Sequence, residues 1–264
     1  MTSFLKTFNP REDIVSSIEV KSSPLWSDEV NPLTTFYTYA QQITISGEYY
    51  INVYDKDPDS DPTATVQFAV AYGHINGNGS SGDPNEVDGT GDTPTKAIYS
   101  QYRNMLLPPT DRVFTFGSSG NSDNILVIDV ARARYRQRVD PGNWELEIGG
   151  NKYGDGSGAN ENPSVNAGGR VFYIYQKDIN DILDTSTVYG LFYPDAGIIM
   201  FAPSVLGIST AASLVSGITS FAARREERVQ STHYFVRATN REFNYTNNPT
   251  FISSSNGDFL YRIS

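Results

Sequence analysis

The 264-residue sequence contains no cysteine and only two histidines. Without cysteine the chain can form neither a disulfide framework nor a thiolate metal site, so its fold must depend on a core, strand ladders or neighbouring chains. His74 and His233 are far apart in the sequence and belong to no motif for a general base or a metal ligand. No G-x-S-x-G, H-E-x-x-H or phosphate-loop motif occurs. We therefore expect no enzyme and no cofactor, although thirty acidic residues leave room for a glycosidase pair of carboxyls.

Basic residues and long apolar runs are also scarce. The 20 basic residues are outnumbered by 30 acidic ones, and the net charge of -10 would repel a phosphate backbone, so no nucleic acid is expected as a partner. Lys6 and Asn9 interrupt the apolar run of roughly 7 to 15 residues that a secretory signal needs, which predicts synthesis in the cytoplasm without a signal peptide. Residues 205–223 carry four Ser, two Thr and two Gly, so no membrane span is expected.

Aromatic residues, glycine and proline are abundant instead: 17 Tyr, 14 Phe, 22 Gly and 14 Pro. This balance favours short strands joined by turns over a helical bundle. Alternation of apolar and polar residues predicts strands within 34–54 and 64–73, and six more follow between residues 112 and 201. The expected fold is mainly β, a β-sandwich or barrel-like core of short strands with one or two helices and extended terminal arms.

The positions of proline, serine and glycine along the chain predict the domain organisation. Residues 1–33 are expected to form an extended N-terminal arm, and residues 34–264 a single β-rich domain. Within that domain, residues 74–93 are too rich in Gly, Asp and Asn to bury a core and are expected to form a disorder-prone loop. One helix is expected from Pro94 to just before Pro108, and a second near residues 205–229, where apolar residues recur every three or four positions.

Four aspartates alternate in the loop after residue 54: Asp55, Asp57, Asp59 and Asp61. This spacing is the one with which a calcium loop gathers oxygen ligands. Such a loop also needs Gly at its sixth position and Glu at its twelfth, where this chain has Ser60 and Val66. We expect a hairpin loop with solvated acids and no metal site, with weak calcium or magnesium binding by the four aspartates as the alternative.

Four arginines alternate in the stretch ARARYRQRV: Arg132, Arg134, Arg136 and Arg138. In a strand this spacing places all four guanidinium groups on one face. Neighbouring like charges repel by a few tenths of a kcal/mol, so the face needs an acidic surface opposite, within the chain or on a partner. A plain solvated edge strand and a nucleic-acid contact are the alternatives.

Further residues are candidates for contact with other molecules. Leu25 and Trp26 are expected to anchor the N-terminal arm on a neighbouring surface, as such arms often do. Phe243 and Tyr245 share one face of an expected strand that closes in the turn 247–249 and contacts a partner near a sheet edge. Tyr153 is the best candidate for stacking on a host sugar, should the protein be a receptor-binding module.

Three long blocks lie in the second half of the chain: YRQRVDPGNWELEIGG (Tyr135–Gly150), VYGLFYPDAGIIMF (Val188–Phe201) and FVRATNREFNYTNNPTF (Phe235–Phe251). They resemble, in the same order, blocks in virion structural proteins of contractile-tailed phages, particularly the T4-like phages of cyanobacteria and other marine bacteria. The resemblance covers the chain from about Lys96 onward.

The resemblance implies a particle component rather than an enzyme. It implies a place in the virion, with several copies per particle and other phage virion proteins as partners. The expected position is the baseplate of the tail; a neck or head-proximal position and a receptor-binding module at the tail tip are the alternatives. Assembly contacts, not catalytic residues, are what such a family would share.

Overall fold

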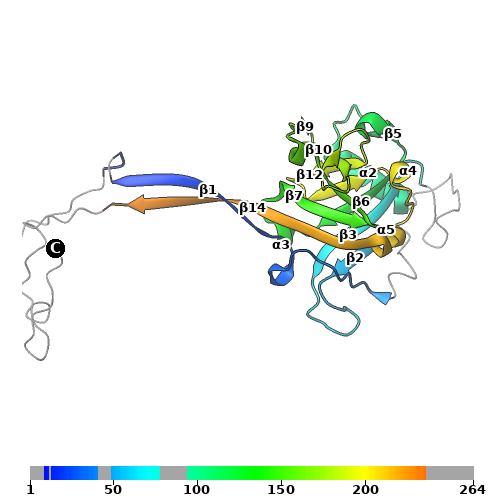
Figure 1. Ribbon diagram of the computed structural model, residues 1–264, viewed down its shortest axis with the longest axis horizontal. Coiled ribbons are helices and arrows are strands. Elements are labelled where there is room, and N and C mark those ends of the chain that lie inside the picture. Colours follow the sequence, from blue (N-terminus) through cyan, green and yellow to red (C-terminus); the bar gives the residue numbers. More distant parts are fainter. Residues whose placement is uncertain (1–8, 12, 41–48, 78–93, 236–264) are drawn as a thin grey trace, which may run out of the picture. The chain divides into compact units, whose positions relative to one another are not determined.

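The computed structural model describes residues 9–11, 13–40, 49–77 and 94–235. The chain divides into two compact units, which are described separately. The larger unit is Val20–Glu227, and the smaller unit joins Met1–Glu19 to Arg228–Ser264. Residues 20–33, expected in the N-terminal arm, therefore belong to the larger unit. The fold is mainly β, as predicted, and its large curled antiparallel sheet forms a half-barrel (Figure 1).

The described strands are, in chain order, β1 (Ile14–Pro24), β2 (Tyr50–Tyr54), β3 (Val66–His74), β4 (Phe114–Thr115), β5 (Asn121–Ser122), β6 (Asn124–Val130), β7 (Arg138–Ile148), β8 (Asn151–Asp155), β9 (Ser164–Asn166), β10 (Gly169–Lys177), β11 (Leu183–Asp184), β12 (Gly190–Tyr193), β13 (Ile198–Phe201) and β14 (Ile218–Tyr234). The described helices are α2 (Pro94–Leu106), α3 (Arg132–Tyr135), α4 (Pro203–Leu206) and α5 (Ala211–Gly217), with 3-10 turns η1 (Ser27–Glu29), η2 (Gly117–Ser119) and η3 (Gly156–Ala159).

The main sheet has the strand order β1-β14-β7-β8-β10-β12-β13-β6-β3-β2, with β9 and β11 also paired to β10, and β4 and β5 form a separate pair. Its central strands are buried on both faces. In β6, Leu126, Ile128 and Val130 enter one core cluster, while Ile125 and Val127 enter the other. Because successive side chains of a strand point to opposite faces, a strand buried on both faces is apolar at nearly every position. This continuous apolar run is the pattern that predicted a strand here.

Helices complete both cores. The first core contains Leu214 of α5, and the second contains Tyr99 and Leu106 of α2. The helix predicted from Pro94 is confirmed as α2, which ends at Leu106. The described helices fall short, in length or in apolar character, of what a membrane crossing requires.

The helix predicted near residues 205–229 is present only at Ala211–Gly217, and the prediction is wrong for the residues that follow. Short helices α4 and α5 are followed by the long strand β14, which pairs with β7. The buried residues Ile218 and Phe221 are three positions apart because the register shifts between Ile218 and Ser220. A β-bulge inserts one residue and converts the spacing of two into three, which imitates helical periodicity.

Candidate interaction surface

In the smaller unit, residues 13–19 and 228–235 form an antiparallel ribbon from the outer parts of β1 and β14. The Phe235 N–H donates to the Asp13 carbonyl at 2.8 Å. The hydroxyls of Ser16 and Thr232 lie 3.2 Å apart. Both contacts fit a single register, in which Ile14 lies opposite Tyr234 and Ile18 opposite Gln230. The same register holds in the larger unit, where the Leu25 N–H donates to the Ala223 carbonyl at 3.0 Å.

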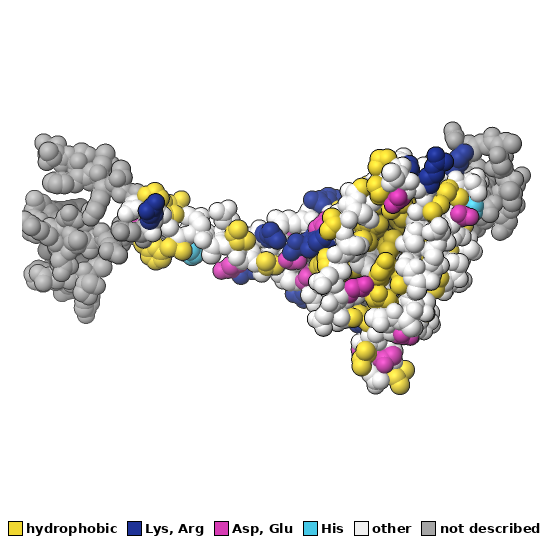
Figure 2. Space-filling view, turned by 90° about the horizontal axis from the view of Figure 1, so that it is seen from above, with side chains coloured by type: hydrophobic (Ala, Val, Ile, Leu, Met, Phe, Trp, Pro, Cys, Tyr) yellow, Lys and Arg dark blue, Asp and Glu magenta, His cyan; other side chains and the backbone are white. Residues whose placement is uncertain are grey.

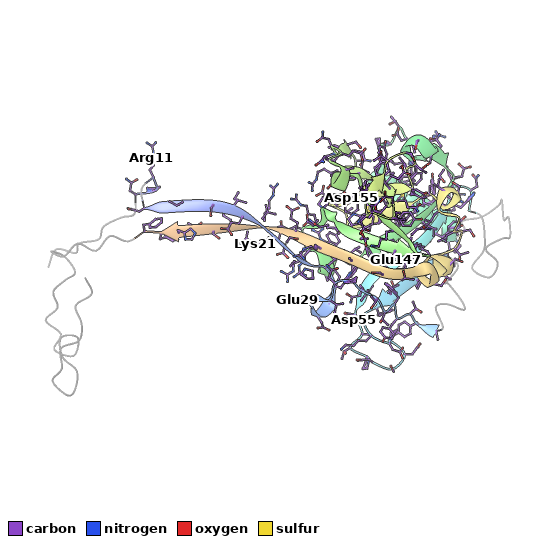
Figure 3. All side chains as sticks on the ribbon, viewed as in Figure 1. Arg11, Lys21, Glu29, Asp55, Glu147 and Asp155 are labelled. Atoms are coloured by element: carbon purple, nitrogen blue, oxygen red, sulfur yellow. The ribbon has the colours of Figure 1, made fainter. Side chains whose placement is uncertain are left out.

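A tight turn precedes the ribbon in the same unit. The Asp13 N–H donates to the Asn9 carbonyl at 2.8 Å, and the Asn9 N–H donates to the Asp13 carboxylate at 2.8 Å. The Arg11 N–H donates to the Asn9 side chain at 3.1 Å. Figure 3 labels Arg11 at this turn. Asparagine and aspartate thus use their short side chains to fix the entry into β1.

The register assigns the side chains of the ribbon to two faces. One face carries Ile14, Ser16, Ile18, Gln230, Thr232 and Tyr234; we call this part, residues 14–18 and 230–234, the uncharged face, and Arg228 follows it on the same side. Ile18 is 70% exposed and Tyr234 61% exposed on it. The opposite face is mixed: it exposes Val15, Val229 and Phe235 beside Glu19 and His233. Figure 2 shows hydrophobic side chains of this ribbon beside polar and charged ones.

A two-stranded ribbon of this kind has little stability by itself in water. Two paired strands alone are at best marginally stable, and three strands or a covering element are needed for independent stability. In the described residues β1 is the last strand of the sheet, and β7 pairs with β14 only from Ile218 to Glu226. The ribbon therefore offers apolar faces and open strand edges, and it is the strongest candidate for a protein-binding surface in the described chain.

Leu25 and Trp26 do not project from the chain, which corrects the expectation that they anchor on a neighbour. They are 0% and 2% exposed and belong to the first core of the larger unit. The Trp26 indole N–H donates to the Phe221 carbonyl at 2.7 Å, and its ring lies 4.7 Å from the Phe221 ring. The proline and serine residues around them suggested an arm, but the anchor site is the protein's own β14.

The four arginines do not share a strand face, so that prediction is wrong. Arg132 and Arg134 lie in α3, Arg136 follows it with a φ of +54°, and only Arg138 begins a strand. The turn buries Tyr135, which is 5% exposed and donates its hydroxyl to the Ala196 carbonyl at 2.8 Å. Burial of this ring determines the backbone path, and the alternation of arginines carries no strand signal.

The acidic partner expected for the arginines is present within the chain for two of them. Arg138 makes a bidentate ion pair with Glu226 of β14, with side chains 18% and 11% exposed. Arg136 lies 3.2 Å from Glu227, which also contacts Arg225 at 3.2 Å. The pair of Arg138 with Glu226 joins β7 to β14 at the end of their shared ladder. Arginine geometry suits such bidentate pairs.

The aspartate loop is the connection of an antiparallel hairpin, as predicted, because β2 pairs with β3 on either side of it. Each aspartate accepts a bond from a backbone N–H: Asp55 from Thr65, Asp57 from Asp59, Asp59 from Ala40 and Asp61 from Thr63. The Thr63 hydroxyl and N–H lower the pKa of Asp61. In the described chain no group of three or more acidic or histidine side chains converges as metal ligands. The four aspartates thus bond to separate backbone N–H groups, one of them, that of Ala40, outside the loop.

Tyr153, the candidate for sugar stacking, is 4% exposed, so that role is excluded for its ring in this fold. It lies in β8 with its ring 5.7 Å from that of Phe201, and burial raises its pKa to about 12. Phe243 and Tyr245, the candidates near the C-terminus, lie outside the described residues, as does most of the loop 74–93.

A hollow of about 330 Å³ lies beside β8, lined in part by Gly154, Asp155 and Lys177. The Lys177 ammonium is paired with Glu145. Asp155 is 2% exposed, and burial raises its pKa even though it accepts bonds from the N–H groups of Gly142 at 2.9 Å and Ser157 at 3.0 Å. These bonds tie the positive-φ turn at Gly142 to η3. Asp155 thus holds the chain's own backbone, and Lys177 is held by a side chain of the same chain.

Comparison with known proteins adds no relative: no protein-family model matches the chain, and neither a curated protein nor a solved structure does. The function must therefore be argued from the residues.

The sequence alone did not identify Ile18 and Tyr234 as exposed residues of a ribbon. The alternation of apolar and polar residues from Ile14 to Val20 is typical of a strand. Its partner strand β14, however, was predicted in part as a helix.

Proposed function

We propose that the protein is a structural component of a contractile phage tail, placed at the baseplate, and that it acts through protein–protein contacts without catalysis. Two kinds of observation support this proposal. The three sequence blocks resemble virion structural proteins. In the fold, Tyr135–Gly150 spans β7 and Val188–Phe201 spans β12 and β13, so these two blocks belong to the scaffold of the sheet.

The ribbon of the smaller unit is the single structural observation that carries the proposal. It exposes Ile18, Tyr234 and Phe235 by more than half of each side chain. Covering apolar area of this kind contributes about 25 cal/mol per Å² removed from water. Monomeric soluble proteins rarely expose a large contiguous apolar patch, whereas an assembly component buries such a surface against a neighbour.

The receptor-binding alternative loses its best residue, because Tyr153 is buried. The baseplate and neck alternatives both require assembly contacts, and the ribbon supplies such contacts in either case. The tail position rests on the resemblance, whereas the assembly role rests on the resemblance and the ribbon together.

The test compares two exposed isoleucines in particles. Ile18→Glu places a charge on the uncharged face, and Ile179→Glu places one at a fully exposed position of the larger unit. Both variants are expected to fold, as judged by circular dichroism and thermal unfolding. Quantitative mass spectrometry of purified virions should find Ile179→Glu at wild-type level and Ile18→Glu strongly depleted. Equal incorporation of both variants would contradict a role for the ribbon in assembly.

A further inference from the structure

The outer edge of β1 has its backbone hydrogen-bonding groups directed away from β14. In an antiparallel pair, opposed residues alternate between pairs that exchange backbone hydrogen bonds and pairs that do not. The bonds at Asp13 and at Leu25 place the odd-numbered residues of β1 in the bonded pairs with β14. The N–H and C=O groups of Ile14, Ser16 and Ile18 therefore point outward, at the end of the sheet formed by the described residues.

This edge lacks the devices that usually prevent strands from pairing. Natural edge strands carry proline, lysine, an inward charge or a bulge where they must stay single. The stretch IVSSI from Ile14 to Ile18 contains no proline, no glycine and no charged residue. A third strand added here would also convert a marginal two-stranded ribbon into a sheet of sufficient size to be stable.

The sequence of β1 is complementary to itself when read in the opposite direction. If Ser17 lies opposite Ser17 of a second copy, Ile14 lies opposite Val20 and Ser16 opposite Ile18. In the same register Asp13 lies opposite Lys21, so opposite charges face each other and no like charges meet. Figure 3 labels Lys21 on β1. A two-fold axis through Ser17 would relate the two strands, as in the commonest closed dimers.

We propose that the outer edge of β1 pairs antiparallel with the same edge of a second copy of this chain. The result is a continuous ladder in the order β14-β1-β1-β14, with the two uncharged faces joined into one uncharged surface. This inference adds a partner to the proposed assembly function. It rests on that function in one respect: it assumes that the ribbon binds another protein chain. A particle can incorporate the protein even if this pairing is absent, so the two claims fail separately.

Single cysteines in the full-length chain test the pairing, because the natural sequence contains none. In the proposed ladder Ser17 and its copy form a pair without mutual backbone bonds, with Cβ atoms about 5 Å apart, which a disulfide can bridge after a small adjustment. Ser231→Cys is the matched control, since Ser231 lies opposite Ser17 within the ribbon but on β14. The two copies of β14 would be outermost in the ladder and about 14 Å apart, beyond disulfide reach.

Under mild oxidation at micromolar concentration, Ser17→Cys should form a covalent dimer at least about tenfold faster than Ser231→Cys, because only the first pair falls within disulfide geometry. The unmodified chain should sediment as a dimer. A monomeric natural chain, or equal rates for the two cysteine variants, overturns the proposal. If the Ser17→Cys variant becomes disulfide-linked in particles only to a different protein, self-pairing is also overturned, while the assembly function is supported.

Discussion

At the scale of single residues, two aspartates respond to their surroundings in opposite directions. Burial raises the pKa of Asp129, whose carboxylate accepts a bond from the Tyr102 hydroxyl at 3.2 Å. The bidentate bonds from Arg170, at 2.7 and 3.1 Å, lower the pKa of Asp195. Neither effect was readable from the sequence, because Tyr102 and Arg170 are each 25 or more positions away from the aspartate they contact.

The two aspartates predict opposite pH dependences of stability. The raised pKa of Asp129 means that its contribution is full below the unfolded-state pKa of about 4 and is lost as the pH rises through the folded-state pKa. Asp129→Asn cannot ionise, so the variant should become more stable relative to the natural protein as the pH rises from about 3 to 7. Urea unfolding at several pH values measures this difference.

Asp195→Asn is the matched control with the opposite sign. The lowered pKa of Asp195 gives a contribution that is present above the unfolded-state pKa and is lost as the pH falls through the folded-state pKa. Its variant should therefore become less stable relative to the natural protein as the pH rises over the same range. The same trend in both variants would contradict these pKa directions.

Gly190 predicts a packing effect at one position. A Cβ at this site would lie 2.1 Å from the Met200 carbonyl oxygen and 3.0 Å from the Ile174 side chain. Gly190→Ala should destabilise the fold by about 1–3 kcal/mol or more, because β12 must shift away from β13. Gly154→Ala is the control: its nearest neighbour is the flexible Lys177 side chain at 3.5 Å. Chemical unfolding should show a much smaller cost for Gly154→Ala than for Gly190→Ala.

At the scale of elements, the predictions from sequence held where one physical signal dominated. The apolar runs of β6 and β13 predicted strands because both faces are buried, and α2 was predicted from Pro94 because cap and periodicity agreed. They failed at β14, where a bulge imitated helical spacing, and at α3, where burial of Tyr135 overrode the arginine alternation. Both failures arise from tertiary contacts that no local pattern records.

The junction of β14 with β7 predicts unequal roles for two adjacent glutamates. Glu226→Ala leaves the largely buried Arg138 without its partner, and breaking such a pair costs about 3–5 kcal/mol. Glu227→Ala breaks the contacts of Glu227 with Arg136, which is 59% exposed, and with Arg225, which is 20% exposed. Because Arg225 still donates to the Arg134 carbonyl at 3.3 Å, a smaller loss of about 1 kcal/mol is expected. Thermal and urea unfolding of both variants measure the two losses of stability. Similar losses would contradict a larger contribution from the buried pair.

At the scale of the whole molecule, the β-rich fold was predicted correctly from the sequence, whereas two of the residues expected to contact other chains are core residues. Leu25 and Trp26 were expected to reach a neighbour and instead fill the first core. The residues that replace them as candidates, Ile18 and Tyr234, lie on strands whose pairing joins distant parts of the sequence. No local pattern predicts which side chains such a pairing exposes.

Hydrogen exchange of the isolated chain should separate the ribbon from the sheet. At concentrations too low for association, amides of residues 14–19 should exchange far faster than those of β6, because few buried contacts hold the ribbon closed. Raising the protein concentration should slow exchange at 14–19 and leave β6 unchanged. Strong protection of 14–19 at every concentration would show that the ribbon is stable without a partner.

The central claim is that the chain is an assembly component of a contractile tail, and a side-chain-resolution density map of purified virions tests it most directly. We predict density for the chain at symmetry-related positions of the tail, with the residues 14–18 and 230–234 covered by another protein chain. Virions that lack the protein, although the producing cells contain it in abundance, would contradict the claim. Incorporated copies whose ribbon faces open solvent would contradict the role assigned to that surface.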